Sequence, residues 1–146
     1  MTSSPAEVIA REARAELWGE ALRAARDWEP VFSPLAPEQF ALGLETVYEA
    51  YLVHYGEPRL FDTPGEDERV LLGDYLYAHG LVRVAHAGGV GAVAVLAELI
   101  ATCAALRAER RAGDGDAWVA ASRKLGGDPL PDLVARALDA HARRFT

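Results

Sequence analysis

The chain has little cysteine and no pattern typical of β-strands, and these two absences limit the kinds of fold and binding site that it can form. Its 146 residues include a single cysteine, Cys103, so neither an internal disulfide nor a cysteine-rich zinc site can form within it. Apolar and polar residues alternate over no more than a few positions, so we expect no sheet. A glycine-rich phosphate loop of the kind that follows a strand is also excluded, because the motif requires that strand.

Positive charge is scarce as well. Lys124 is the only lysine, and 22 acidic residues outnumber 15 basic ones, which gives a formal net charge of -7 at pH 7. Because nucleic-acid binding depends on Lys and Arg at the phosphates, we expect no nucleic-acid partner. The N-terminus lacks a basic region followed by an apolar run, which predicts no secretion signal and favours a cytoplasmic location.

One apolar segment, residues 84–106, is long enough to suggest a membrane span. His86, the glycine pair at 88–89 and Glu98 interrupt it. A carboxylate near the centre of a bilayer costs about 2.5–3.5 kcal/mol, so we expect no membrane span. The segment instead predicts a buried core helix.

Helical periodicity dominates and predicts an all-α fold, a single domain over residues 1–146 built as a bundle of five or six helices. Thr63, Pro64 and Glu66 form a capping-box pattern that predicts the start of the third helix. The expected helices cover about residues 5–28, 37–55, 63–86, 90–111, 116–125 and 131–145. The first of them would bury a face made of Ile9, Ala13, Leu17, Ala21, Ala24 and Trp28.

The third expected helix places a carboxylate among apolar residues. On helical spacing, Asp74 shares a face with Asp67, Val70, Leu71, Tyr77, Ala78 and Leu81. An unpaired buried charge is costly, so Asp74 is expected to be a hydrogen-bonded structural acid, part of a subunit contact or part of a polar cavity.

Other polar residues permit two interpretations each. Glu45 and Glu49 share a helix face, which is typical of a solvated surface, although with Asp67, Asp74 and Glu98 they would also supply carboxylates from three helices to a metal cage. No histidine stands in the Glu-x-x-His arrangement of di-metal bundles. Arg107, Arg110 and Arg111 suit the negative end of a helix dipole, and binding of a diphosphate is the alternative. Cys103 is expected to be a small core residue rather than a nucleophile.

Two short segments carry a resemblance to a known family. Leu52-Val53-His54 ends one expected helix, and Val70-Leu71-Leu72-Gly73-Asp74-Tyr75-Leu76-Tyr77-Ala78 lies in the next, ahead of a long run rich in Ala and Leu. Residues 52–109 thereby resemble the trans-type polyprenyl diphosphate synthases. In that all-α family, a helix that ends in apolar-His-Asp-Asp precedes a loop and a helix that opens with an apolar-Gly-Asp run.

The departures from the family are informative. Its Asp-Asp-x-x-Asp cluster and its second acidic cluster would hold magnesium on a substrate diphosphate, but Tyr55-Gly56-Glu57 follows His54 here and neither cluster is present. Without magnesium ligands, independent prenyl transfer is not expected. We expect no cofactor in this chain, and magnesium only in a catalytic partner.

The resemblance implies half of an isoprenoid-synthase-like fold and a specific role. The chain resembles the small, non-catalytic subunit of heteromeric hexaprenyl or heptaprenyl diphosphate synthases, which supports isoprenoid and menaquinone side-chain synthesis together with a catalytic polyprenyl synthase subunit. In that role, the contact between subunits or the wall of the product tunnel would be formed by Asp74, Tyr75, Tyr77, Tyr51, Ala97 and Ala101.

Two functions of other classes stay open. One is a stand-alone helical enzyme, such as a metal-dependent hydrolase or dehydratase that uses Glu45, Glu49, Asp74 and Glu98. The other is a helical interaction protein that forms a homodimer, because tyrosines are favoured at interfaces as well as in cores.

Overall fold

The computed structural model describes residues 3–16, 18–23, 28–63 and 65–146, and their regular structure is helical apart from one isolated bridge. The all-α prediction is therefore confirmed. Five α-helices and three 3-10 turns follow one another along the chain: α1 (Pro5–Ala15), η1 (Gly19–Ala21), η2 (Ser33–Leu35), η3 (Glu38–Phe40), α2 (Ala41–Tyr55), α3 (Glu66–Ala108), α4 (Asp114–Lys124) and α5 (Pro131–Arg143).

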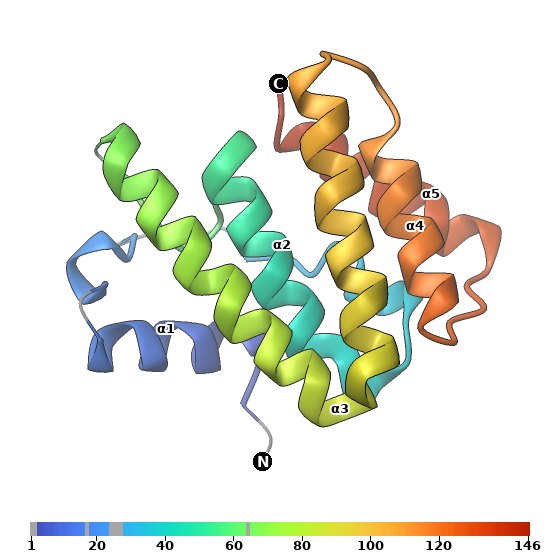
Figure 1. The fold of residues 1–146 in the computed structure, drawn as a ribbon, viewed down its shortest axis with the longest axis horizontal. Helices are drawn as coiled ribbons and strands as arrows, with labels where there is room; N and C mark the ends of the chain where they lie inside the picture. Colours follow the sequence, from blue (N-terminus) through green and yellow to red (C-terminus); the bar gives the residue numbers. More distant parts are fainter. Residues whose placement is uncertain (1–2, 17, 24–27, 64) are drawn as a thin grey trace.

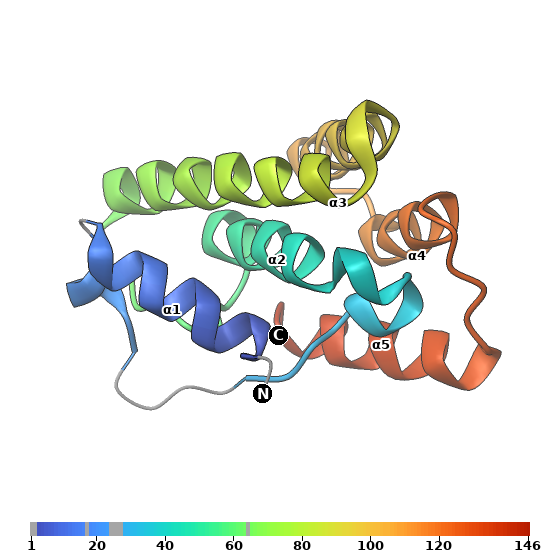
Figure 2. The same cartoon turned by 90° about the horizontal axis from the view of Figure 1, so that it is seen from below.

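The helices are arranged in layers around α2. Figure 2 shows α3 along one side of α2 and α1 and α5 on the other side. Figure 1 shows α1 at one end of the molecule and α4 with α5 at the opposite end. In Figure 2, no described element covers the outer side of α3, which is therefore a surface of the chain.

The central position of α2 follows from its composition. Every residue from Gly43 to Val53 is buried, so this stretch has no solvent face. A helix that is apolar all round is typical of the middle of a bundle. One apolar cluster fills the space between α2, α4, α5 and much of α3, and another joins α1 and α2 to the start of α3. Both clusters therefore depend on α2.

The long helix α3 bends at Gly89, whose φ of 73° and ψ of -162° lie outside the helical region. Glycine adopts a positive φ without the steric cost that other residues meet. The bend divides α3 into a first arm, residues 66–88, and a second arm, residues 90–108, which run in different directions in Figure 1. The break predicted at the glycine pair is confirmed.

The prediction of a first helix that reaches Trp28 is wrong. α1 ends at Ala15, and the chain then turns through η1 to run beside residues 60–62, where Arg23 N donates to Leu60 O and Asp62 N donates to Ala21 O. These backbone hydrogen bonds between distant segments override the helical periodicity. The predicted face retains Ile9 and Ala13 in the core, whereas positions 17 and 24 lie outside the described residues.

The capping-box prediction is also wrong. α3 begins at Glu66 with Gly65 as its N-cap, and no side chain makes a capping hydrogen bond there, so Thr63 is not the cap. Pro64 lies outside the described residues. At α1, by contrast, Ser4 does cap the helix, because its side chain accepts a hydrogen bond from Glu7 N.

Two glycines allow α2 and the first arm of α3 to approach closely. A Cβ at Gly80 would lie 2.5 Å from Val47 Cγ2 and 3.0 Å from Val47 N, and one at Gly43 would lie 2.7 Å from Val84 Cγ2. These glycines face each other, since Gly43 O is 3.3 Å from the position of the Gly80 Cβ. The contact brings backbone against backbone, and it fixes how α3 crosses the central helix.

Gly80→Ala tests this close approach. We expect it to lower the free energy of unfolding by about 1–3 kcal/mol, because the added methyl overpacks the contact with Val47. Gly91→Ala, on the same helix, is the matched control, since nothing lies within 4 Å of its Cβ. It should raise stability by about 0.5–1 kcal/mol through helix propensity alone. Urea unfolding followed by circular dichroism measures both, and equal effects would contradict the proposed contact.

Candidate functional site

The two segments that carry the family resemblance contact each other. His54, near the end of α2, lies against Gly73 so closely that a Cβ there would be 2.3 Å from His54 Nε2. The same nitrogen is 3.4 Å from Asp74 Oδ1, and the imidazole stacks on Tyr77 at 5.1 Å between ring centroids. Burial holds the pKa of His54 below its ordinary value, although the Asp74 carboxylate opposes that effect. Asp74 therefore has a local partner.

Asp74 itself lies at the surface, with 67% of its side chain exposed. The expected apolar face is not the buried one, because Val70, Leu71 and Ala78 are exposed with it. The first arm of α3 instead buries Leu72, Gly73, Leu76, Gly80 and Val84 against α1 and α2. Asp74 is therefore an exposed acid beside His54, and no buried charge is created there.

The three tyrosines proposed for an interface or a tunnel lie in different environments. Tyr75 is half-buried on the α1 side of α3, where it packs on Trp18 and His79. Tyr77 is half-buried beside His54, and burial raises its pKa. Tyr51 is fully inside the core. The structure therefore does not bring these rings together on one surface.

The hydroxyl of Tyr51 belongs to a polar network that the sequence did not predict. It donates to Asp114 Oδ2 at 2.7 Å, and the same oxygen accepts from Arg107 Nη2 at 2.5 Å. On the other side, His141 Nε2 is 3.0 Å from Asp114 Oδ2, while His141 Nδ1 is 2.7 Å from the hydroxyl of Tyr48. The network joins α2, α3, α4 and α5.

This network also explains the position of Arg107 and the low pKa of Asp114. Arg107 is bound to Asp114 and lies over the ring of Phe145 at 3.9 Å, so its role is internal to the fold. Burial alone would raise the pKa of Asp114, but hydrogen bonds from His141 and Tyr51 and the charge of Arg107 hold that pKa well below its usual range. The ionised carboxylate is thus part of the folded state.

A second network lies deeper and contains the two glutamates of α2. Arg59 Nη1 is 2.6 Å from Glu45 Oε1, and Arg59 Nε is 2.9 Å from Glu49 Oε1. All three side chains are fully buried. The solvated face expected for Glu45 and Glu49 is wrong, because α2 has no solvent face over this stretch.

Backbone groups complete this network. Glu45 Oε2 accepts from the N–H groups of Val31 and Ser33, and Glu49 Oε2 accepts from those of Arg59 and Leu60. The guanidinium also lies 4.1 Å from the ring centroid of Trp28 and donates to Glu29 O. Two carboxylates and one cation thereby attach the segments 28–33 and 59–60 to the central helix, with their lone pairs satisfied.

The four carboxylates proposed for a metal-dependent enzyme are not brought together. Glu45 and Glu49 bind Arg59, Asp74 lies beside His54, and Glu98 is on the surface 4.0 Å from Lys124 Nζ. Over the residues that the structure describes, no group of three or more His, Cys, Asp or Glu side chains is placed to hold a metal ion. Cys103 is buried, and burial raises its thiol pKa to about 12, which fits the predicted core residue.

The candidate residues Ala97 and Ala101 lie on an exposed face that extends along both arms of α3. We call it the outer face of α3, and its apolar members are Val70, Leu71, Ala78, Val82, Val90, Ala94, Ala97, Ala101, Ala105 and Ala108. Asp67, Asp74 and Glu98 are the acidic residues beside them. Four of the six large hydrophobic residues exposed in the described chain belong to this face.

This exposure contradicts the prediction of a buried core helix over residues 84–106. Among the described residues, α3 is the one helix that is long and apolar enough to cross a membrane. Only 22% of its most apolar stretch is buried, whereas the core helix of a soluble protein is mostly buried. Small residues every three or four positions make the second arm smooth, which favours close packing against another apolar surface. The chain therefore presents one uncovered apolar face of α3, while the opposite face packs in the core.

Comparison with models of protein families, with curated proteins and with solved structures finds no match for this chain.

Sequence reasoning missed the residues with the densest polar contacts, Arg59, Asp114 and His141. A usable signal was present for the first of them: Glu45 and Glu49 stand in a helix that is otherwise apolar all round, so both had to be buried and paired. The identity of the partner was not predictable, because Arg59 follows in a loop with no periodic pattern.

Arg59→Met tests the buried network. Removal of the cation leaves two carboxylates buried without a counter-charge, so we expect a loss of about 3–5 kcal/mol in the free energy of unfolding at neutral pH. Arg123→Met, an exposed position on α4, is the control and should change stability little. Adding Glu45→Gln and Glu49→Gln to Arg59→Met should recover part of the loss in urea unfolding. Equal stability of the Arg59 and Arg123 variants would contradict this role.

Asp114→Asn tests the second network through its pH dependence. A carboxyl whose pKa is lower in the folded than in the unfolded state stabilises the fold above its unfolded pKa of about 3.9, and loses that contribution as the pH falls toward the folded pKa. We expect the variant to be about 1–3 kcal/mol less stable at pH 7. The difference from the unmodified chain should shrink below about pH 4. Asp116→Asn, exposed in the same turn, is the matched control, and a difference independent of pH would contradict the assignment.

Proposed function

We propose that this chain is an accessory, non-catalytic subunit of a heteromeric long-chain polyprenyl diphosphate synthase, in which it supports isoprenoid and menaquinone side-chain synthesis. The observation that carries the proposal is the uncovered outer face of α3, which belongs to the same helix as the Gly73-Asp74 segment of the resemblance. An apolar helix face of this length is typical of a surface that is buried against another subunit.

The contact between the two resembling segments supports the same proposal. His54 and Gly73 are 19 positions apart in the chain and pack tightly, so the order of features in the sequence corresponds to one local arrangement. Asp74 pairs with His54 there and acts as a structural acid. Magnesium and the departing diphosphate would be held by the catalytic subunit, and this chain would supply an apolar wall through α3.

The charges on the outer face disfavour the homodimer. Glu98 lies near the middle of the second arm, so a two-fold antiparallel pairing of that arm with its own copy would place the two Glu98 side chains close together. Like charges opposed across an interface are unfavourable. Lys124, whose Nζ is 4.0 Å from Glu98 in the same chain, offsets part of that repulsion, and a different partner with a basic residue opposite Glu98 avoids it. The alternative of a stand-alone metal enzyme has less support, because its four carboxylates lie apart.

Ala101→Arg tests the docking surface. When the chain is co-expressed with a catalytic polyprenyl synthase from the same genome, we expect the two to copurify and the product chain length to depend on both. A charge placed in the middle of an apolar interface costs about 3–5 kcal/mol if left unpaired. This cost corresponds to more than about a hundredfold in affinity. Ala101→Arg should therefore abolish copurification, whereas Ala120→Arg, at an exposed alanine of α4, should not.

Several outcomes would contradict the proposal. The first is absence of copurification and of any change in product; another is prenyl elongation by the isolated chain. A stable homodimer in light scattering, indifferent to the synthase and broken by Ala101→Arg, would assign the outer face to a second copy. Flotation of the isolated chain with lipid vesicles, lost in the same variant, would assign it to a membrane.

A further inference from the structure

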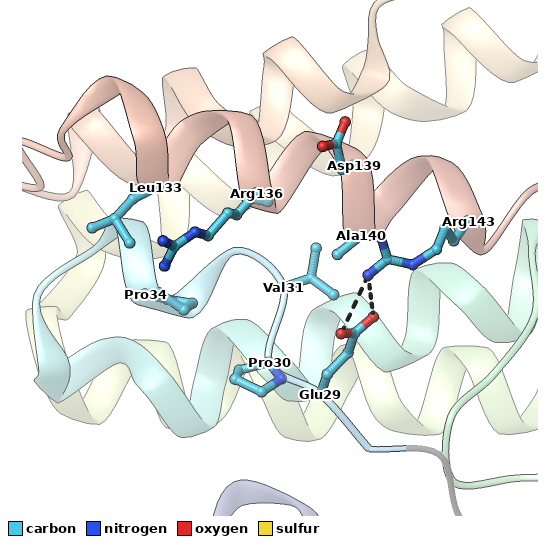
Figure 3. Close-up of a pocket in the computed structure, with 10 residues that line it drawn as sticks. Glu29, Pro30, Val31, Pro34, Leu133, Arg136, Asp139, Ala140 and Arg143 are labelled. Carbon is cyan, nitrogen blue, oxygen red and sulfur yellow. Dashed lines mark hydrogen bonds and ion pairs between the residues drawn. The ribbon is translucent and has the colours of Figure 1, made fainter.

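A groove on the opposite side of the molecule from α3 is lined by two arginines, two acidic residues and several apolar residues. It lies between α5 and the extended segment 29–34, and its volume is about 440 Å³. Figure 3 shows Val31 and Ala140 at its centre, with Arg136 toward one end and the Arg143–Glu29 pair at the other. No contact proposed above for α3 involves this groove.

The two arginines of the groove differ in their contacts. Arg143 Nη2 is 3.2 Å from Glu29 Oε1 and 3.4 Å from Glu29 Oε2, so this guanidinium is held by a carboxylate. Arg136, seven residues earlier and on the same face of α5, makes no hydrogen bond or ion pair with any residue that the structure describes. Figure 3 shows its guanidinium extended toward the segment that holds Pro34.

The rest of the lining favours one class of ligand. The accessible apolar lining consists of Pro30, Pro34 and Leu133, which form an apolar floor above the buried Val31 and Ala140. Asp139 also lines the groove, and its carboxylate points away from Arg136 in Figure 3. An unpaired guanidinium binds carboxylate or phosphate groups through two parallel hydrogen bonds. The groove thus pairs one free cation with an adjacent apolar surface.

The wall opposite α5 is fixed before any ligand binds. Glu45 accepts hydrogen bonds from Val31 N and Ser33 N, and Arg59 donates to Glu29 O, so the buried network holds this segment in place. A preformed wall reduces the ordering that a ligand would otherwise require on binding.

We infer that this groove binds a small organic anion, whose carboxylate or phosphate group contacts Arg136 and whose apolar part lies on Pro34 and Leu133. The apolar part accounts for the floor, which a bare inorganic ion would leave uncovered. This binding concerns the isolated chain and does not depend on the proposed association with a synthase.

Calorimetric titration of the full chain with hexyl phosphate and with hexanoate tests the inference. Inorganic phosphate and hexanol serve as probes of each half of the ligand alone. We expect hexyl phosphate, hexanoate or both to bind at least about tenfold more tightly than inorganic phosphate and hexanol, because each of these lacks one of the two contacts. Binding by only one of the two head groups supports the inference and identifies that head group.

Two variants make the assignment specific. Arg136→Gln should weaken binding by about tenfold or more through loss of the charged hydrogen bonds. Arg123→Gln, an exposed arginine of α4, removes the same charge elsewhere and should leave binding unchanged. Glu29→Gln releases Arg143 and should tighten binding of hexyl phosphate, a gain that misfolding cannot produce.

Three results would overturn the inference. They are absence of binding by both organic anions at millimolar concentration, affinity unaffected by Arg136→Gln, and equal affinity for inorganic phosphate, which would indicate an adventitious ion only. Circular dichroism of the Arg136 variant, whose side chain is exposed, verifies that any loss is not due to unfolding.

Discussion

The interaction on which the rest of the structure depends is the buried contact of Arg59 with Glu45 and Glu49. Two carboxylates and one guanidinium lie without solvent on the central helix, and four backbone N–H groups complete their coordination. The network attaches the two irregular segments around α2 in fixed positions. Both apolar clusters pack against that helix, and one wall of the α5 groove is held by Glu45 and Arg59 of the same network.

The charged residues of the two polar networks bind one another inside the fold. These residues are Arg59, Arg107, Asp114 and the α2 glutamates, and their ion pairs hold the helices together. The outer face of α3 and the α5 groove are two surfaces of the described chain that are available to other molecules. One is apolar with acidic neighbours, and the other joins a free guanidinium to an apolar floor. The two binding proposals above depend on these surfaces.

Much of the fold was predictable, because periodicity and proline or glycine breaks are local signals. The bend at Gly89 and the five helices followed from them. The end of α1 at Ala15 did not, since it depends on pairing between residues 21–23 and 60–62, which no local pattern encodes. The exposure of the candidate site residues was not predictable, because periodicity does not say which face of an apolar helix packs on its neighbour. Ala97, Ala101 and Asp74 are exposed, whereas Tyr51 is buried in the core.

The open surroundings of Gly89 have a mechanical consequence. No neighbouring segment lies within 4 Å of where the Gly89 Cβ would be, whereas Gly88 beside it lies against Phe40, and Gln39 Nε2 donates to Ala87 O. The angle between the two halves of the long helix is therefore set from the inner side, by these contacts and by the packing of each half on the layer beneath. A partner that covered the outer side of both halves at once would contact α3 on either side of Gly89. Such a partner would stabilise one value of the angle between the halves.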